Sequence, residues 1–355
     1  MKIKKRNLII ILISLISIIG YVSYKEKSNL LTIVSKTDGR WIVATILLMV
    51  AYWTLESITL HMVTSKLHDR QKFKDTVKTT MIGQFFNCVT PFSSGGQPMQ
   101  ALHMAKTGVP FGIASCCLLT KFIVYQLVLT LYSLAVLSFK LKEFVGTING
   151  FTYMVFVGFA VNTVVVVGLL SIGYSKTGTV KWTCKIIDRL GKFGWIKHVE
   201  EKKHYVRREF NSFYESFKWM KQNKKMIFYM MICSTIQLTA YFLVPYFILK
   251  GFHLQGSVSS VIAAQAFVLM ISSFIPLPGA AGGAEVSFFT FFKLFFPPNV
   301  LNVSILVWRM ITFYLTLCVG MCFTFWRRDE GAVRDRLKGR NTIQLLARTT
   351  KKPKS

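Results

Sequence analysis

The 355-residue chain has few acidic residues: 15 Asp and Glu stand against 44 Lys and Arg, which gives a net charge of +29. In a soluble protein this imbalance would point to nucleic acid as a partner. Two further absences exclude common kinds of chemistry. The sequence has no C-x-x-C pair or His cluster that suggests a metal site, and no nucleotide-binding loop or Ser-His-Asp set. We therefore expect no metal, no cofactor and no catalytic residue.

Hydrophobic sequence is abundant instead, at 52% of the residues. Seven apolar runs come near or exceed the length at which a helix crosses the ~30 Å hydrocarbon layer. They are 8–22, 41–61, 113–139, 151–174, 226–249, 258–275 and 301–326. The first run is short and follows four basic residues, but no small-residue cleavage site comes after it, so we interpret it as a retained anchor. The chain is predicted to be an all-α integral membrane protein.

The basic residues gather outside these runs. Most of the net charge lies in residues 1–7, 62–80, 175–225 and 327–355. By the positive-inside rule, these stretches face the cytoplasm. The sequence thus predicts a multi-pass protein of the cell membrane with both termini cytoplasmic, in which 1–328 form the membrane domain and 329–355 a basic cytosolic tail.

This topology leaves two segments, near 81–105 and 258–296, that must enter and leave the membrane on the same side. Proline and glycine interrupt each segment in the middle, as expected of a re-entrant hairpin. Both interruptions have the pattern Pro-x-x-x-Gly-Gly, and a cation follows each at nearly the same distance, Lys121 in one case and Arg309 in the other. Two such elements that enter from opposite faces are typical of an inverted-topology repeat.

The interrupted segments and the few ionisable residues of the apolar runs form the candidate site. Unsatisfied backbone groups are costly in lipid, and a charge at the bilayer centre costs roughly 3 kcal/mol. Glycine near a helix N-terminus can present N–H donors to an anion, and a buried Lys or Arg can hold a phosphate. The predicted lipid-binding residues are Glu56, Asn87, Pro91, Gly95, Gly96, Lys121, Pro278, Gly279, Gly282, Gly283, Glu285 and Arg309.

The same residues also have structural interpretations. The prolines and glycines can simply shape turns, and Lys121 and Arg309 can extend toward the nearer headgroups. Glu285 can pair with either cation and hold it in place without a ligand. Glu56 is a candidate for an ion-pair partner or a proton carrier.

Aromatic and basic residues alternate in 175–225. Phe210, Phe213, Tyr214 and Phe217 recur at helical spacing and form one aromatic face. We interpret this segment as an interfacial helix that lies on the anionic inner leaflet. RNA binding is the alternative, but no RNA-binding signature accompanies these residues, so no nucleic-acid partner is expected.

Two motifs resemble the lysylphosphatidylglycerol synthase transmembrane-domain family. They are QFFNCVTPFSSGGQP at 84–98 and IPLPGAAGGAE at 275–285, and the resemblance extends over roughly residues 5–328. Ala281 and Ala284 depart from the glycine-rich run that is more common in the second motif. The resemblance implies a stand-alone counterpart of the flippase half of the multiple peptide resistance factor. Such a protein would bind and move an anionic or aminoacylated phospholipid such as (lysyl-)phosphatidylglycerol, a lipid linked to antibiotic resistance.

Two other functions stay open at this stage. One is phosphatidylglycerol lysyltransferase activity, which the family name implies; in bifunctional relatives it belongs to a separate cytosolic domain, for which the tail after Trp326 is too short. The other is a non-transporting scaffold that docks a cytosolic lipid-modifying enzyme on 175–225. The sequence also leaves open a homo-oligomer, the headgroup and the direction of transport.

Overall fold

A computed structural model describes residues 37–68, 72–145, 199–273 and 275–325, together with isolated helical residues between 159 and 189. Within these residues every regular element is a helix. In chain order the elements are α3 (Gly39–Leu67), α4 (Phe73–Val89), η1 (Pro91–Ser93), α5 (Gly96–Lys106), α6 (Phe111–Val145), α9 (Val199–Gln222), α10 (Lys224–Gly251), α11 (Val258–Ser272), η2 (Pro278–Ala280), α12 (Gly283–Phe292), α13 (Pro298–Arg309), η3 (Met310–Tyr314) and α14 (Leu315–Phe325). The all-α prediction is confirmed.

Four of the described helices are long and apolar enough to cross a membrane. They are α3, α6 over Phe111–Lys140, α10, and the continuous run α13–η3–α14 over Pro298–Phe325. These helices match the runs predicted at 41–61, 113–139, 226–249 and 301–326. The predicted run 8–22 and, apart from isolated residues, the run 151–174 lie outside the described residues.

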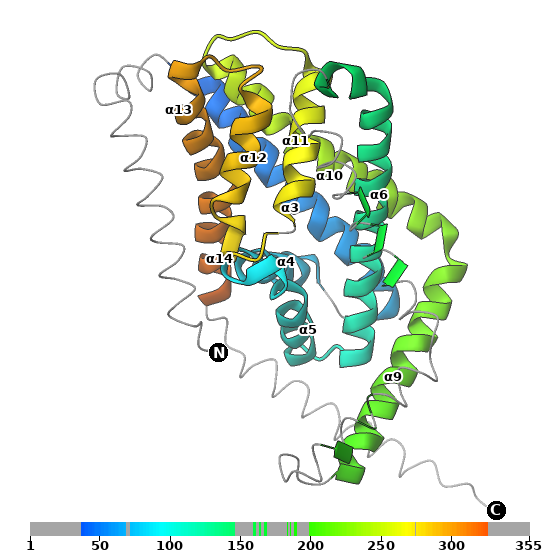
Figure 1. Ribbon diagram of the computed structural model, residues 1–355. Helices are drawn as coiled ribbons and strands as arrows, with labels where there is room; N and C mark the ends of the chain where they lie inside the picture. The colour runs from blue at the N-terminus through cyan, green and yellow to red at the C-terminus, as the bar shows by residue number, and fades with distance from the viewer. Residues whose placement is uncertain are drawn as a thin grey trace, which may run out of the picture.

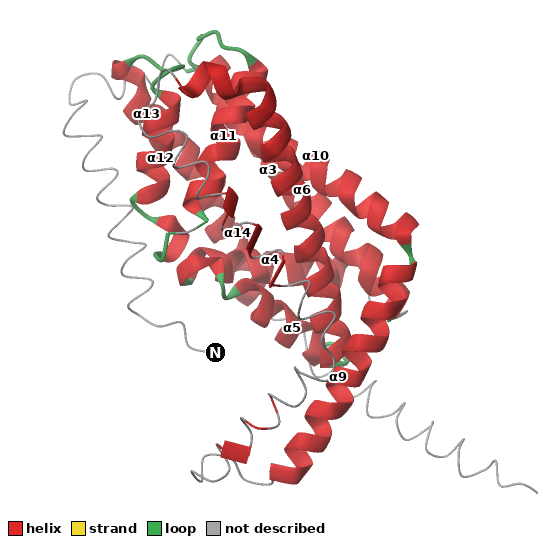
Figure 2. Ribbon diagram, turned by 45° about the vertical axis from the view of Figure 1, so that its right-hand side comes forward, coloured by secondary structure: helices red, strands yellow, loops and turns green. Residues whose placement is uncertain are grey.

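The helices α3 and α10 form an antiparallel pair through the middle of the bundle (Figures 1 and 2). Near one end, the rings of Trp41 and Phe247 are 5.4 Å apart. Further along, Tyr52 lies 5.5 Å from Tyr241. The residue number rises along α3 while it falls along α10, so the two helices run in opposite directions. This pair carries three of the site residues described below.

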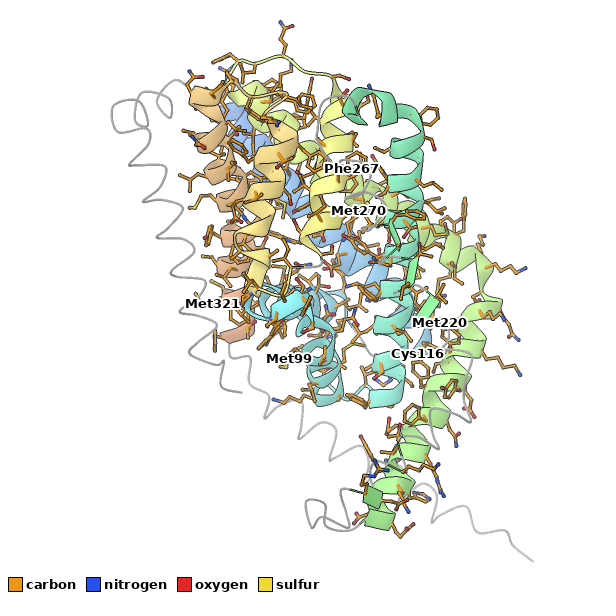
Figure 3. The ribbon with its side chains drawn as sticks, in the orientation of Figure 1. Met99, Cys116, Met220, Phe267, Met270 and Met321 are labelled. Carbon is orange, nitrogen blue, oxygen red and sulfur yellow. The ribbon has the colours of Figure 1, made fainter. Side chains whose placement is uncertain are left out.

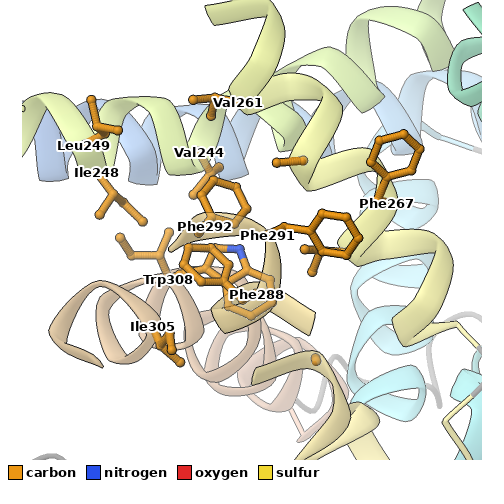
Figure 4. Packing of buried hydrophobic residues seen from close by; sticks show 14 of the residues in the cluster. Val244, Ile248, Leu249, Val261, Phe267, Phe288, Phe291, Phe292, Ile305 and Trp308 are labelled. Carbon is orange, nitrogen blue, oxygen red and sulfur yellow. The ribbon is translucent and has the colours of Figure 1, made fainter. Parts of the chain in front are cut away.

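Aromatic rings build the core around α12 (Figures 3 and 4). Phe288 stacks on Phe292 at 4.0 Å and on Trp308 of α13 at 4.6 Å. Phe291 stacks on Phe267 of α11 at 5.7 Å. Stacked rings bury a large apolar area in defined geometry. The core therefore fixes α12 against α13 next to Arg309.

The units α4–η1–α5 and α11–η2–α12 are two hairpins that approach each other from opposite ends of the molecule, and their tips η1 and η2 are in contact (Figure 1). The two hairpins have the same layout, and corresponding positions of the two are separated by the same number of residues along the chain. Each starts its turn at a proline, its second arm at the second glycine of the Gly-Gly step, and the next long helix an equal number of residues later. This arrangement is the one expected of an inverted repeat.

The backbones of the two turns are also alike. Thr90 and Leu277, which precede the prolines, have φ/ψ of −117°/146° and −113°/148°. Phe92 and Gly279, which follow them, have positive φ of 54° and 62°. A positive φ is unfavourable for a residue as bulky as phenylalanine, so the surrounding structure must impose it. Unlike side chains therefore begin the two turns with the same backbone, which then diverges, since Gly95 has φ of −82° and its counterpart Gly282 has φ of 83°.

The connection predicted at 62–80 is mostly helix. α3 continues to Leu67 and α4 already begins at Phe73, so only residues 68–72 connect them, and the first hairpin starts well before residue 81. The apolar pattern did not predict the end of α3 and the start of α4, because basic residues interrupt the pattern there. Lys and Arg are nevertheless good helix formers.

The aromatic face of α9 packs against the protein rather than lying free for the inner leaflet. Phe213 and Tyr214 are buried in a core shared with α3, α6 and α10. The backbone N–H of Gly112 in α6 donates to the Glu209 carboxylate over 2.7 Å. This face is therefore covered by protein, and the position of α9 on the inner leaflet stays a prediction. An amphipathic pattern is the same whether the apolar face covers lipid or protein.

Candidate functional site: two buried ion pairs beside the hairpins

The first ion pair joins α6 to α3. Lys121 Nζ lies 2.5 Å from Glu56 Oε1, and only 13% and 9% of the two side chains are exposed. The other carboxylate oxygen, Oε2, accepts a hydrogen bond of 2.5 Å from Gln84 Nε2 of α4. Glu56 thus uses both oxygens, one for a cation and one for the arm of the first hairpin. Because Lys121 points to Glu56, its extension toward the headgroups is not observed.

The second ion pair joins α13 to α12. Arg309 Nε donates to Glu285 Oε1 over 2.7 Å, and side-chain exposure is 6% and 15%. The two Nη atoms donate to backbone oxygens of the η2 turn, Nη1 to Gly279 over 3.1 Å and Nη2 to Ala280 over 3.4 Å. The guanidinium therefore holds the tip of the second hairpin through its planar fork of donors. Of the two partners the sequence allowed for Glu285, the structure selects Arg309.

The two cations differ in how many partners they have. Arg309 has three protein acceptors, and the rings of Trp308 and Phe313 lie 5.2 and 5.4 Å from its Cζ. Lys121 has Glu56 as its one acceptor among the described residues. An ammonium carries three donors. A guanidinium carries five donors, so both cations keep donors for a ligand, but Arg309 is held in place by three acceptors and Lys121 by one.

In the first hairpin, the predicted donors are already paired within the protein. The N–H of Gly96 donates to Asn87 Oδ1 over 3.0 Å, and the N–H of Gly95 donates to Thr90 Oγ1 over 2.8 Å. A Cβ added at Gly96 would lie 2.1 Å from Asn87 Oδ1 and 2.8 Å from Gly83 O. Asn87, Gly95 and Gly96 thus close the turn, and their N–H groups are not free for an anion in this structure.

In the second hairpin, the glycines serve the backbone and its packing. Gly279 and Gly282 have φ of 62° and 83°, in the region that glycine adopts at little cost. A Cβ at Gly279 would lie 2.2 Å from a ring carbon of Phe313, and one at Gly283 would lie 1.9 Å from Cδ1 of Ile275. Pro91 and Pro278 begin the two turns, as expected of residues with a fixed φ.

Three tyrosines lie between the ion pairs and were not predicted. Tyr52 of α3 and Tyr125 of α6 both lie near Glu56. Tyr241 of α10 packs on Tyr52 and lies near Thr312 and Arg309. Thr312 belongs to the π-helical turn η3, and such turns often occur at functional sites. Single tyrosines inside apolar runs resemble ordinary core residues, so this group of buried hydroxyls could not be predicted from the sequence.

No group of three or more His, Cys, Asp or Glu side chains lies close enough to hold a metal ion in the part of the chain that the structure describes. The described cysteines are all free thiols.

Comparison with known proteins decides the family. The family described as "Lysylphosphatidylglycerol synthase TM region" matches residues 7–320. The chain belongs to this family. A UPF0104 membrane protein of Archaeoglobus fulgidus is similar to the chain, with 24% identity over 299 residues. These residues are 84% of this chain and 89% of the relative. A second UPF0104 membrane protein, of Methanocaldococcus jannaschii, is 21% identical over 332 residues, which are 90% of this chain and 95% of that one.

Membership of the lysylphosphatidylglycerol synthase TM family confirms the resemblance seen in the two hairpin motifs. It establishes a multi-pass membrane protein. The names of the two UPF0104 relatives state no substrate.

Proposed function

We propose that this protein is a lipid translocator of the cell membrane that binds an anionic or aminoacylated phospholipid, such as (lysyl-)phosphatidylglycerol. The observation that carries the proposal is the pair of buried cation–carboxylate contacts, Lys121–Glu56 and Arg309–Glu285, beside two hairpins that meet tip to tip. Buried ion pairs contribute little net stability, because removing both charges from water offsets their attraction. Their retention in an apolar bundle favours a role in binding.

A lipid phosphate is a suitable ligand for such a site. It is a compact anion that a Lys or Arg side chain binds well, and it competes with a carboxylate for the same donors. Lys121 has the free donor capacity for this exchange, while Arg309 holds the second hairpin in shape. The lipid tails can stay in the bilayer while the headgroup passes through the protein. We assign Lys121 as the headgroup anchor and Arg309 as a positioning residue.

The test is leaflet-resolved movement of fluorescent phosphatidylglycerol and lysyl-phosphatidylglycerol in liposomes that contain the purified full-length protein. We expect Lys121→Gln to slow movement at least about tenfold, the effect of losing one charge-assisted contact. The matched control is Lys218→Gln, which removes an exposed lysine of α9 and should leave the rate unchanged. Equal rates in the Lys121 variant, the control and the parent protein would refute the assignment.

A further inference from the structure

The surroundings of Glu56 make it dependent on a single cation. Lys121 of α6 is the one basic residue within ion-pair distance of Glu56 among the described residues, and Gln84 of α4 gives it a neutral donor. The other titratable groups that face it are Tyr52 on its own helix and Tyr125 of α6, and Tyr241 of α10 packs on Tyr52. Neither a tyrosine hydroxyl nor an amide compensates a full negative charge.

Headgroup binding would therefore leave Glu56 with an uncompensated charge. If a phosphate replaces Glu56 as the ion-pair partner of Lys121, the Glu56 carboxylate keeps one hydrogen bond from Gln84 and stays buried. An isolated buried carboxylate is strongly disfavoured, and such a group responds by taking up a proton. Phosphatidylglycerol brings no cation of its own that could replace Lys121. One proton is then the charge that restores balance.

The second ion pair does not undergo the same exchange. Arg309 is held by two backbone carbonyls of η2 in addition to Glu285, so it stays beside Glu285 when a ligand arrives. A guanidinium also stays protonated under all relevant conditions. The structure thus singles out Glu56 from the two buried carboxylates.

We propose that Glu56 is a proton-binding site coupled to headgroup binding: the phosphate displaces Glu56 from Lys121, and Glu56 takes up one proton from water. No covalent bond changes in this step. The ion pair and the free phosphate become a protonated carboxyl and an ammonium–phosphate pair. This inference rests on the proposed function and adds that transport of an anionic lipid responds to pH.

The experiment measures binding of dioctanoyl-phosphatidylglycerol to the purified full-length protein in detergent, by calorimetry, between pH 5.5 and 8. In parallel, an indicator dye in weakly buffered solution follows proton uptake. We expect uptake of about one proton per lipid bound, and binding that weakens about tenfold for each unit of rising pH while Glu56 is ionised in the free protein. This arm uses the unmodified protein, so it does not depend on the folding of a variant.

A variant and its control complete the test. Glu56→Gln should bind the lipid without proton uptake and with an affinity independent of pH, whereas Glu215→Gln, which changes an exposed carboxylate of α9, should behave as the parent protein does. Lipid binding by the parent without proton uptake would overturn this inference and leave the proposed function standing. If the parent fails to bind or move either lipid at any pH, the proposed function falls as well.

Discussion

At the scale of single residues, Arg309 is a buried charge whose contacts in the structure stabilise the second hairpin. Its position in an apolar helix is visible in the sequence, and Glu285 is one of few available partners. The two carbonyl acceptors in η2 could not be predicted, because they depend on where the chain returns after the turn. Likewise, Glu56 and Lys121 are recognisable as buried charges, but their pairing is a property of how α3 and α6 pack.

The role of the Arg309 fork leads to a stability prediction. Arg309→Lys keeps the positive charge but cannot reach Glu285 and both carbonyls at once, so we expect a loss of about 2 kcal/mol, the value of one or two charge-assisted hydrogen bonds. Thermal unfolding of the purified protein in detergent measures this loss. Arg207→Lys, at an exposed position of α9, is the control and should change stability by less than about 0.5 kcal/mol. Identical melting of both variants would show that the carbonyl contacts contribute nothing.

At the scale of elements, the first hairpin depends on one glycine more than on its neighbours. The helix α5 begins at Gly96, where the chain passes within van der Waals contact of Asn87 and of the carbonyl of Gly83. We expect Gly96→Ala to cost about 1–3 kcal/mol, since an added methyl must push two parts of α4 aside. Gly39→Ala is the matched control, because nothing lies within 4 Å of the added atom there.

The same unfolding measurement compares the two glycine variants. A melting temperature for the Gly96 variant equal to that of the Gly39 variant would mean that the turn can relax without cost. A lower melting temperature together with reduced lipid movement would show that the shape of the hairpin matters for transport.

The two hairpin turns could be predicted from the sequence, but the partner of the aromatic face of α9 could not. Pro91 and Pro278 with their following glycines predicted both interruptions, because proline and glycine act locally on the backbone. The aromatic face of α9 did not reveal what covers it, because burial against α6 and burial at a membrane surface require the same periodicity. Local signals therefore located the turns, while the partner of each face depended on the tertiary structure.

At the scale of the whole molecule, the two hairpins and the long helices that follow them are related by direction as well as by sequence spacing. Hairpin α4–η1–α5 and hairpin α11–η2–α12 come from opposite ends, and the contact between η1 and η2 lies between the ends of the bundle (Figures 1 and 2).

This arrangement predicts which ends of the molecule face which side of the membrane. The exposed residue Lys106 ends the first hairpin, and the exposed residue Gln255 precedes the second. With the basic stretches inside, we expect Lys106→Cys to react with an impermeant maleimide only from the cytoplasmic side and Gln255→Cys only from the outside. The measurement is labelling in intact cells and in inverted membrane vesicles, and label taken up by the parent protein is subtracted. Reaction of both cysteines from the same side would refute the inverted arrangement, and reaction of each from the side opposite to expectation would keep the repeat but reverse the orientation inferred from the basic residues.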